Sequence, residues 1–336
     1  MYLFILLLFL IPWPPHAEAQ QVTLQSEMSE AAGYFLQTLT PGERQKALLD
    51  FHDPTRIEWS NEPVNMHPRK GLRLDEMTDV QKKALHRLLQ TALSGQGYLK
   101  VINVIRLDEW LKEHKDRDPI DEVVGQGLYW VTIFGRPGIS HRWGWRFEGH
   151  HLSLNITVSP EGIDATPFFL GAHPSAIPEG PMAGTETLFE ETRLGWRLLE
   201  SLNDAQRKQA ILSDRLPKDV MVINTGKEPE AKTLTGIPVA SLNAAQQQLV
   251  RQIINCYVQN LTPPLATHYT DLIQKKAWHD LHFSWMGAAQ EGKPVYYRIQ
   301  SAGGFIIEYC TRESDITHIH TLWHWLPGDF GGATAE

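Results

Sequence analysis

The stretch Trp143-Gly-Trp-Arg-Phe-Glu-Gly-His-His-Leu-Ser-Leu-Asn-Ile-Thr157 alternates apolar and polar side chains. Successive side chains of a strand point to opposite faces of a sheet, so this alternation predicts a β-hairpin with one apolar and one polar face. With Glu148-Gly149 as a two-residue turn, Phe147 lies opposite His150 and Arg146 lies opposite His151. The polar face is then expected to carry Arg142, Arg146, His151, Ser153, Asn155 and Thr157.

Four segments carry the same signal for the start of a helix. In each, a capping side chain stands three residues before Glu or Gln, which is the capping-box pattern. The capping residues are Thr40, Thr78, Asn203 and Asn243. Apolar residues at helical spacing follow each cap, so we predict two pairs of helices, one pair in each half of the chain.

The elements after each pair also correspond in order. Third helices are expected at 98–114 and 269–278, strands at 128–135 and 282–287, hairpins opening at 143–146 and 295–298, and fourth strands at 163–169 and 317–325. We therefore predict an α+β fold of two pseudo-repeated halves, each with three helices followed by a four-stranded antiparallel meander. The halves are 20–172 and 187–336, and the Pro- and Gly-rich stretch 173–186 is the predicted linker.

The ends and the composition restrict where the protein works. Residues 1–19 are almost wholly apolar up to Trp13 and end in Ala17-Glu18-Ala19, which predicts a signal peptide cleaved after Ala19 and a secreted or periplasmic protein. No segment of the mature chain is long and apolar enough to span a membrane. The net charge of −8, without a basic run, argues against nucleic acid as a partner. Cys256 and Cys310 permit one disulfide without requiring it.

Three blocks together resemble a known family. They are Trp145–Asn155, Pro167–Pro174 and His318-x-His320-x-x-Trp323, and they resemble the domain of unknown function 3500 family through nearly all of the mature chain. That family usually continues after the last Trp with Arg-Asp, where this chain has His324-Trp325. The resemblance implies an often exported family and no established activity.

The second half suggests a metal site. With Ser301-Ala302-Gly303 as the hairpin loop, Tyr296 lies opposite Glu308, and Arg298 shares their polar side. His318 and His320 point to one face of the last strand because they are two residues apart. Imidazole pairs of this kind suit Zn, Cu or Fe, with a carboxylate as ligand or orienting group.

These patterns leave three functions open. The leading hypothesis is a metal-assisted enzyme, a hydrolase or an oxidoreductase, that acts on a small molecule or polymer outside the cytoplasm. In it, His318 and His320 bind the metal, His151 and Glu308 are catalytic, and the ligand-binding residues are Arg142, Arg146, Asn155, Tyr296 and Arg298. The alternatives are a non-catalytic binding module for an anionic ligand and a structural envelope protein. Glu308 can instead pair with Arg298, which is the alternative to its role in the metal site. The apolar neighbours of His150 favour a core or rim position for this residue.

Overall fold

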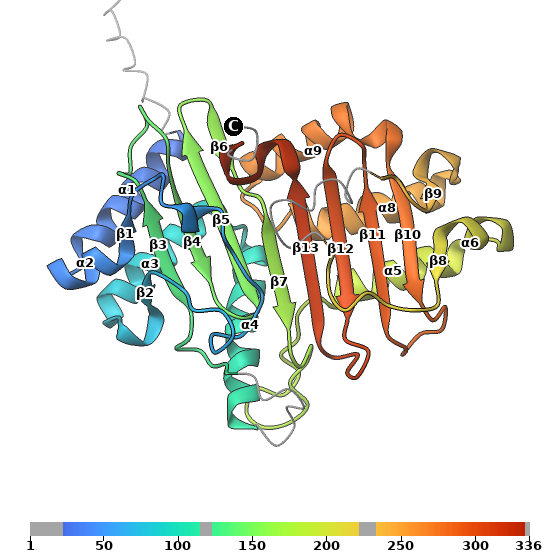
Figure 1. The fold of residues 1–336 in the computed structure, drawn as a ribbon, viewed down its shortest axis with the longest axis horizontal. Helices are drawn as coiled ribbons and strands as arrows, with labels where there is room; N and C mark the ends of the chain where they lie inside the picture. The colour runs from blue at the N-terminus through green and yellow to red at the C-terminus, as the bar shows by residue number, and fades with distance from the viewer. Residues whose placement is uncertain (1–22, 115–122, 222–232, 333–336) are drawn as a thin grey trace, which may run out of the picture.

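The computed structural model of the chain describes residues 23–114, 123–221 and 233–332, so the predicted signal peptide lies outside the described residues. The predicted α+β class is confirmed: helices cover one face of a large mixed sheet (Figure 1). The helices are α1 (Leu24–Gln37), α2 (Pro41–Ala47), α3 (Asp79–Ala92), α4 (Gly95–Glu113), α5 (Phe189–Ser201), α6 (Asp204–Ala210), α8 (Ala244–Val258) and α9 (Pro263–Lys276).

The sheet has 13 strands in the described part of the chain, and its main path runs β1-β3-β4-β5-β7-β13-β12-β11-β10-β8. The strands of the first half are β1 (Leu48–Leu49), β2 (Leu72–Arg73), β3 (Trp130–Phe134), β4 (Trp143–Glu148), β5 (Leu152–Ser159), β6 (Gly162–Asp164) and β7 (Phe168–Ala172). Those of the second half are β8 (Ile211–Ser213), β9 (Ile237–Pro238), β10 (His282–Gly287), β11 (Val295–Gln300), β12 (Phe305–Thr311) and β13 (Ile319–Trp325).

Local sequence signals account for much of this arrangement. All four predicted capping boxes form, at the N-termini of α2, α3, α6 and α8. The structure adds two long helices that we did not predict, α1 and α5, and short strands at both edges of the sheet. Neither α1 nor α5 begins with a capping box, which is why the search for that signal did not find them.

The strands of the two halves meet at the centre of the sheet. There β7 pairs antiparallel with β13, and Gly171 lies opposite His320. On each side a meander leads outward to a parallel edge pair, β1 with β3 and β8 with β10. The strand order is therefore alike from either edge, while the duplication of the chain stays a prediction.

The predicted register of both hairpins is wrong. Phe147 pairs with Leu154 and Arg146 with Asn155, so the turn contains Gly149, His150 and His151. The strand pairing is displaced from the predicted one by an even number of residues, so each side chain stays on its predicted face and the two faces of the hairpin keep their polarity. The backbone N–H of Gly149 donates to the carbonyl of Leu152 at 2.9 Å, so His150 and His151 form the tip of the hairpin, and His151 bonds to α4 as described below.

In the second hairpin, Arg298 rather than Tyr296 lies opposite Glu308. This shift is also even, so Tyr296, Arg298 and Glu308 still share one face. That face also carries His320, because Cys310, two residues after Glu308, pairs with His320.

The sheet face opposite the helices is partly covered by the segment around the 3-10 helix η1 (Pro54–Arg56), which crosses in front of β4 and β5 (Figure 1). Arg146 fastens this segment by donating to the backbone carbonyls of Thr55, Arg56 and Glu58. As a result Arg146 is 3% exposed, and the polar face of the first hairpin is an interior surface.

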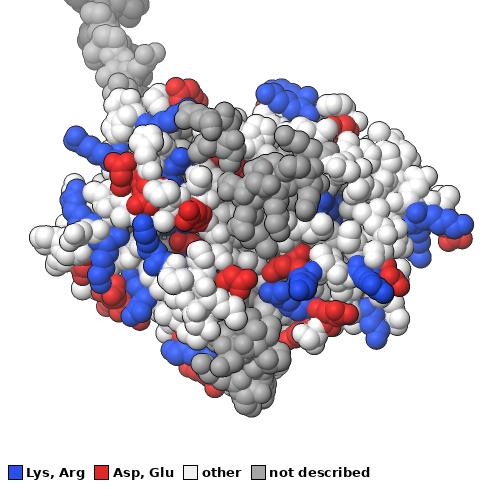
Figure 2. Space-filling view, in the orientation of Figure 1, with Lys and Arg blue, Asp and Glu red and all other residues white. Residues whose placement is uncertain are grey.

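Two further sequence questions are answered by the described residues. Cys256 on α8 and Cys310 on β12 are both free thiols. None of the helices in the described ranges combines the length and the apolar character needed to cross a bilayer. On the face seen in Figure 2, acidic and basic side chains are interspersed.

One partly buried carboxyl group gives a prediction for the pH dependence of stability. Burial and the nearby Asp329 raise the pKa of Asp164 to about 6 from 3.8, although Arg142 acts in the opposite direction. Between about pH 4 and pH 6 the folded protein therefore keeps a proton that the unfolded chain has released, so the free energy of unfolding falls as the pH rises. The loss is at most about 3 kcal/mol.

We expect Asp164→Asn to remove this loss, so that the variant gains stability over the wild type as the pH rises from 4 to 7. Urea unfolding at a series of pH values measures the difference. Asp271→Asn, at an exposed position on α9, is the control and is expected to follow the wild type. A constant difference between Asp164→Asn and the wild type across this range would contradict the assignment.

Candidate metal centre

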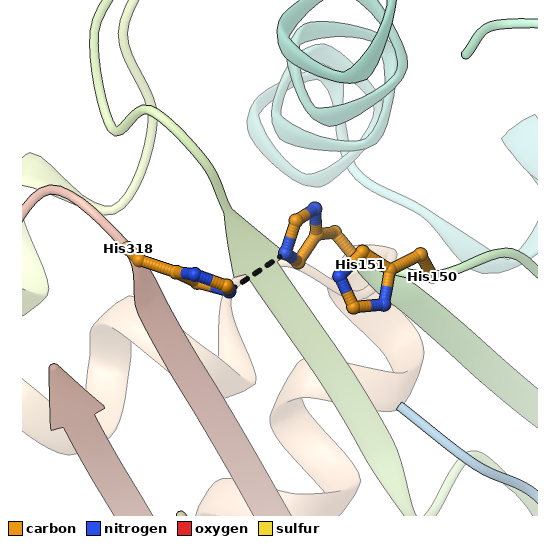
Figure 3. A group of neighbouring side chains, drawn as sticks. All are labelled: His150, His151 and His318. Carbon is orange, nitrogen blue, oxygen red and sulfur yellow. Dashed lines mark hydrogen bonds between the residues drawn. The ribbon is translucent and has the colours of Figure 1, made fainter. Parts of the chain in front are cut away.

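Three histidines meet where β5, β7 and β13 lie side by side. His151 is in the turn before β5, His318 immediately precedes β13, and His320 is the second residue of β13. Figure 3 shows the rings of His151 and His318 pointing toward each other from these two places. The three residues are 0%, 1% and 1% exposed. A cluster of imidazoles is thus enclosed in the protein interior.

The rings converge through the same atom. Nε2 of His151 lies 3.1 Å from Nε2 of His318, which in turn lies 3.1 Å from Nε2 of His320. Three nitrogens bound to one tetrahedral ion at the usual 2.0–2.1 Å are roughly 3.3 Å apart. The spacing of each of these two pairs is therefore close to that of two imidazoles that share an ion, while the ring centres of His151 and His320 are farther apart, at 5.7 Å.

Carboxylates hold the other side of two of these rings. Nδ1 of His151 lies 2.6 Å from Oδ1 of Asp108 on α4, and Nδ1 of His320 lies 2.7 Å from Oδ1 of Asp219. A carboxylate accepts a hydrogen bond, so Nδ1 carries the proton in both rings, and in the neutral form of each ring Nε2 carries a lone pair. Both lone pairs point into the cluster, which is the orientation that a metal ligand needs.

Each carboxylate has further partners that fix it. Tyr129 donates to Oδ2 of Asp108 at 2.5 Å, and burial raises the pKa of Tyr129 well above its ordinary value, so this phenol stays protonated. Burial opposes ionisation of Asp219, but His320 and Arg312 outweigh it and lower the pKa of this carboxyl. Asn61 also donates to Asp219, at 3.0 Å.

Two more buried histidines flank the cluster. A ring nitrogen of His150 lies within 4.8 Å of ligand atoms on His151 and His318, and among the described residues these three form a group that could hold a metal ion. The ring of His173 stacks on that of His318 with centroids 4.2 Å apart, and its Nε2 lies 3.2 Å from Asp315. His173 therefore packs against the cluster, while His150 contributes to it.

The cluster lies above a glycine of β7. A Cβ atom on Gly171 would come within 2.7 Å of Cδ2 of His151 and 3.1 Å of Cδ2 of His320. The absence of a side chain at this position lets both rings lie against the strand. The same glycine donates its backbone N–H to the carbonyl of His151 at 2.8 Å, which fixes the turn.

A pocket reaches the cluster from outside. It has a volume of about 650 Å³, and His150 lines it together with residues of two surface loops. These are Glu62, Pro63 and Met66 on one side and Arg312, Glu313 and Ser314 on the other. A small molecule can therefore approach the histidines from the His150 side.

The structure separates the predicted site residues into four places. His151, His318 and His320 come together in the cluster, although we had placed His151 beside Arg146. Arg146 and Asn155 are bonded to each other at 2.7 Å beneath the η1 segment, and Arg142 is exposed just before β4. The ligand-binding roles of these last three residues stay predictions.

The remaining candidates form a second buried group. Glu308 accepts from Arg298 at 2.9 Å, from Tyr296 at 2.5 Å and from the backbone N–H of Met221 at 2.9 Å. The pairing of Glu308 with Arg298 is the one that we gave as the alternative to a role of Glu308 in the metal site. The predicted catalytic role of Glu308 stays a prediction.

Two residues of the cluster carried signals that we did not use. Asp108 occupies the apolar stripe of α4 that also contains Val101, Val104 and Leu111, and an acidic residue in such a stripe needs a buried partner. His150 adjoins His151 in the same turn, but its apolar neighbours led us to favour a core position. Asp219 lies in a loop between β8 and β9, and no local pattern indicates it.

Gly171→Ala tests whether the rings depend on the space above β7. The added methyl group must displace His151 and His320, so we expect retention of a bound transition metal to weaken roughly 10–100-fold, as is usual when the support of a ligand is disturbed. Gly144→Ala is a matched control, because its Cβ would meet the carbonyl of Ile156 at 2.7 Å on a strand away from the histidines. Equal metal loss in the two variants would show that general destabilisation is responsible.

Comparisons with known proteins give one match. No curated protein and no solved structure matches the chain. The family model described as "Protein of unknown function (DUF3500)" matches residues 21–332, nearly the whole chain, which confirms the resemblance found in the sequence. The chain therefore belongs to the DUF3500 family.

Proposed function

We propose that this protein is a transition-metal-dependent enzyme that acts outside the cytoplasm on a molecule entering through the pocket beside His150. The observation that carries the proposal is the convergence of Nε2 atoms from His151, His318 and His320, with carboxylates on the far side of two of the rings.

The hydrogen-bonding pattern favours a cation at this point. In their neutral forms, Nε2 of His151 and of His320 each carry a lone pair, and each lies 3.1 Å from Nε2 of His318. A bound ion uses a lone pair from each of the three Nε2 atoms.

The donor set narrows the choice of ion. Imidazole nitrogen suits Zn, Cu and Fe, whereas Ca and Mg prefer oxygen ligands. Asp108 and Asp219 are bound to the histidines at Nδ1, so they orient the rings and raise their basicity. Such an ion supplies a bound water of lowered pKa for hydrolysis, or electron transfer if it is redox-active.

The first prediction concerns metal content. Protein purified without a His tag and exposed to Zn or Cu is expected to hold one equivalent after dialysis, measured by elemental analysis. Because His151 and His318 belong to every ligand set that the geometry permits, His151→Ala and His318→Ala should lose at least about 100-fold in affinity. His279→Ala, at an exposed position, is the control and should keep the metal.

Failure of the wild type to bind any transition metal under these conditions would remove the proposal. If His318→Ala unfolds the protein, circular dichroism will reveal it. The milder His318→Gln then tests the same point, because glutamine keeps the size and polarity of the position.

A second experiment separates an enzyme from a binding module. Metal-loaded wild type and His318→Ala are incubated with a mixture of extracellular metabolites and oligosaccharides, and the mixtures are compared by mass spectrometry. An enzyme consumes a compound in many-fold excess over protein. Retention of a compound at one equivalent, without conversion, would instead support the binding module.

Export is part of the proposal and has its own test. Because residues 1–19 have the pattern of a cleaved signal peptide, we expect the mature chain to begin at Gln20. Mass spectrometry of protein recovered from outside the cytoplasm measures the N-terminus. Exported material that still begins with Met1 would contradict the signal assignment.

A further inference from the structure

We infer that His151, His318 and His320 anchor the ion and that its fourth coordination position faces the pocket on the His150 side, where it takes an oxygen or nitrogen donor of the substrate. This inference rests on the proposed function and divides the four clustered histidines into three anchors and one pocket-side residue.

The distances between ring centres distinguish His150 from the others. An imidazole bound to an ion at 2.0–2.1 Å has its ring centre roughly 3.2 Å from that ion, so two rings on a tetrahedral ion have centres roughly 5.2 Å apart. His151, His318 and His320 have centres separated by 5.1, 4.9 and 5.7 Å. The separations that involve His318 are close to this value, and the separation of His151 from His320 is somewhat longer.

His150 does not fit the same arrangement. Its ring centre is 6.3 Å from that of His318 and 6.4 Å from that of His320, but only 3.9 Å from that of His151. A ring at these separations is too far from two of the anchors and too near the third to complete a tetrahedron. His150 therefore lies beside the ion position rather than in the tetrahedral set.

The surroundings of the rings agree with this division. The Nδ1 atoms of His151 and His320 are bonded to Asp108 and Asp219, which fixes the direction of both rings. His150, in contrast, is the one histidine of the four among the residues that line the pocket. A catalytic zinc site typically has three protein ligands and leaves the fourth position to water or substrate.

The expected ligand follows from this geometry. It carries a donor atom that binds a transition metal, such as a hydroxyl, carboxylate or amine, and its remainder fits a pocket of about 650 Å³ between the loops of Met66 and Ser314. The pocket walls are thus expected to control access to the ion.

Cobalt(II) reports on both parts of the inference, because its visible spectrum depends on the number and type of its ligands. His150→Ala is expected to keep one equivalent of cobalt, while His318→Ala and His320→Ala lose at least about 90% of it at the same concentration. Azide, a small exogenous donor, is expected to change the spectrum of both the wild type and His150→Ala.

Two results would overturn the inference while leaving the metal centre intact. The first is loss of cobalt from His150→Ala as complete as from His318→Ala, which would make His150 an anchor. The second is an azide response in His150→Ala but not in the wild type, which would place the His150 ring in the fourth position. A wild type that takes up no cobalt overturns the proposed function and this inference together.

Larger side chains at the pocket wall test whether azide reaches the ion through this pocket. We expect Met66→Trp and Ser314→Trp to slow the azide response at least tenfold in stopped-flow measurements, with cobalt content unchanged. Ile316→Trp is the matched control, since Ile316 is 40% exposed on the same loop and does not line the pocket. Equal rates in all three variants would show that the fourth position is reached by another route.

Discussion

The hydrogen bond between His151 and Asp108 is the contact on which the centre of this protein depends. It ties the turn before β5 to α4. Nε2 of the same ring then meets His318 at the start of β13, from the other half of the chain. Because β7 lies between β5 and β13, one imidazole connects a helix, a turn and the junction of the two halves.

Asp108 and Asp219 stabilise the buried histidines by hydrogen bonding. Imidazoles packed together cannot all be charged, because desolvation and mutual repulsion oppose it. Asp108 and Asp219 each accept from one Nδ1, so the neutral rings have a defined tautomer and direct their lone pairs inward. The same bonds orient the rings as the proposed metal site requires.

Much of the fold could be predicted from the sequence because its signals are local. Capping boxes, strand alternation and the faces of both hairpins each depend on a few neighbouring residues. The position of His151 could not, since its ring bonds to Asp108, which lies 43 residues earlier in the chain. His318 and His320 were predicted together because strand periodicity places them on one face, whereas Asp219 reaches His320 from a loop 101 residues away.

For Arg146 and Arg298, the local sequence pattern predicted the face of the sheet but not its burial. Arg146 and Arg298 looked like substrate clamps because each stands on the polar face of a hairpin. In the fold that face is interior: Arg146 bonds to backbone carbonyls of the covering segment, and Arg298 pairs with Glu308. A polar strand face is exposed only if no loop crosses it, and hairpin periodicity carries no information about distant loops.

X-ray absorption spectroscopy of the metal-loaded, untagged protein tests the central claim most directly. The account predicts nitrogen or oxygen neighbours at roughly 2.0–2.1 Å, with the outer-shell scattering of about three imidazoles and no sulfur. Fewer than two imidazoles, or a thiolate neighbour at roughly 2.3 Å, would contradict a centre built from His151, His318 and His320.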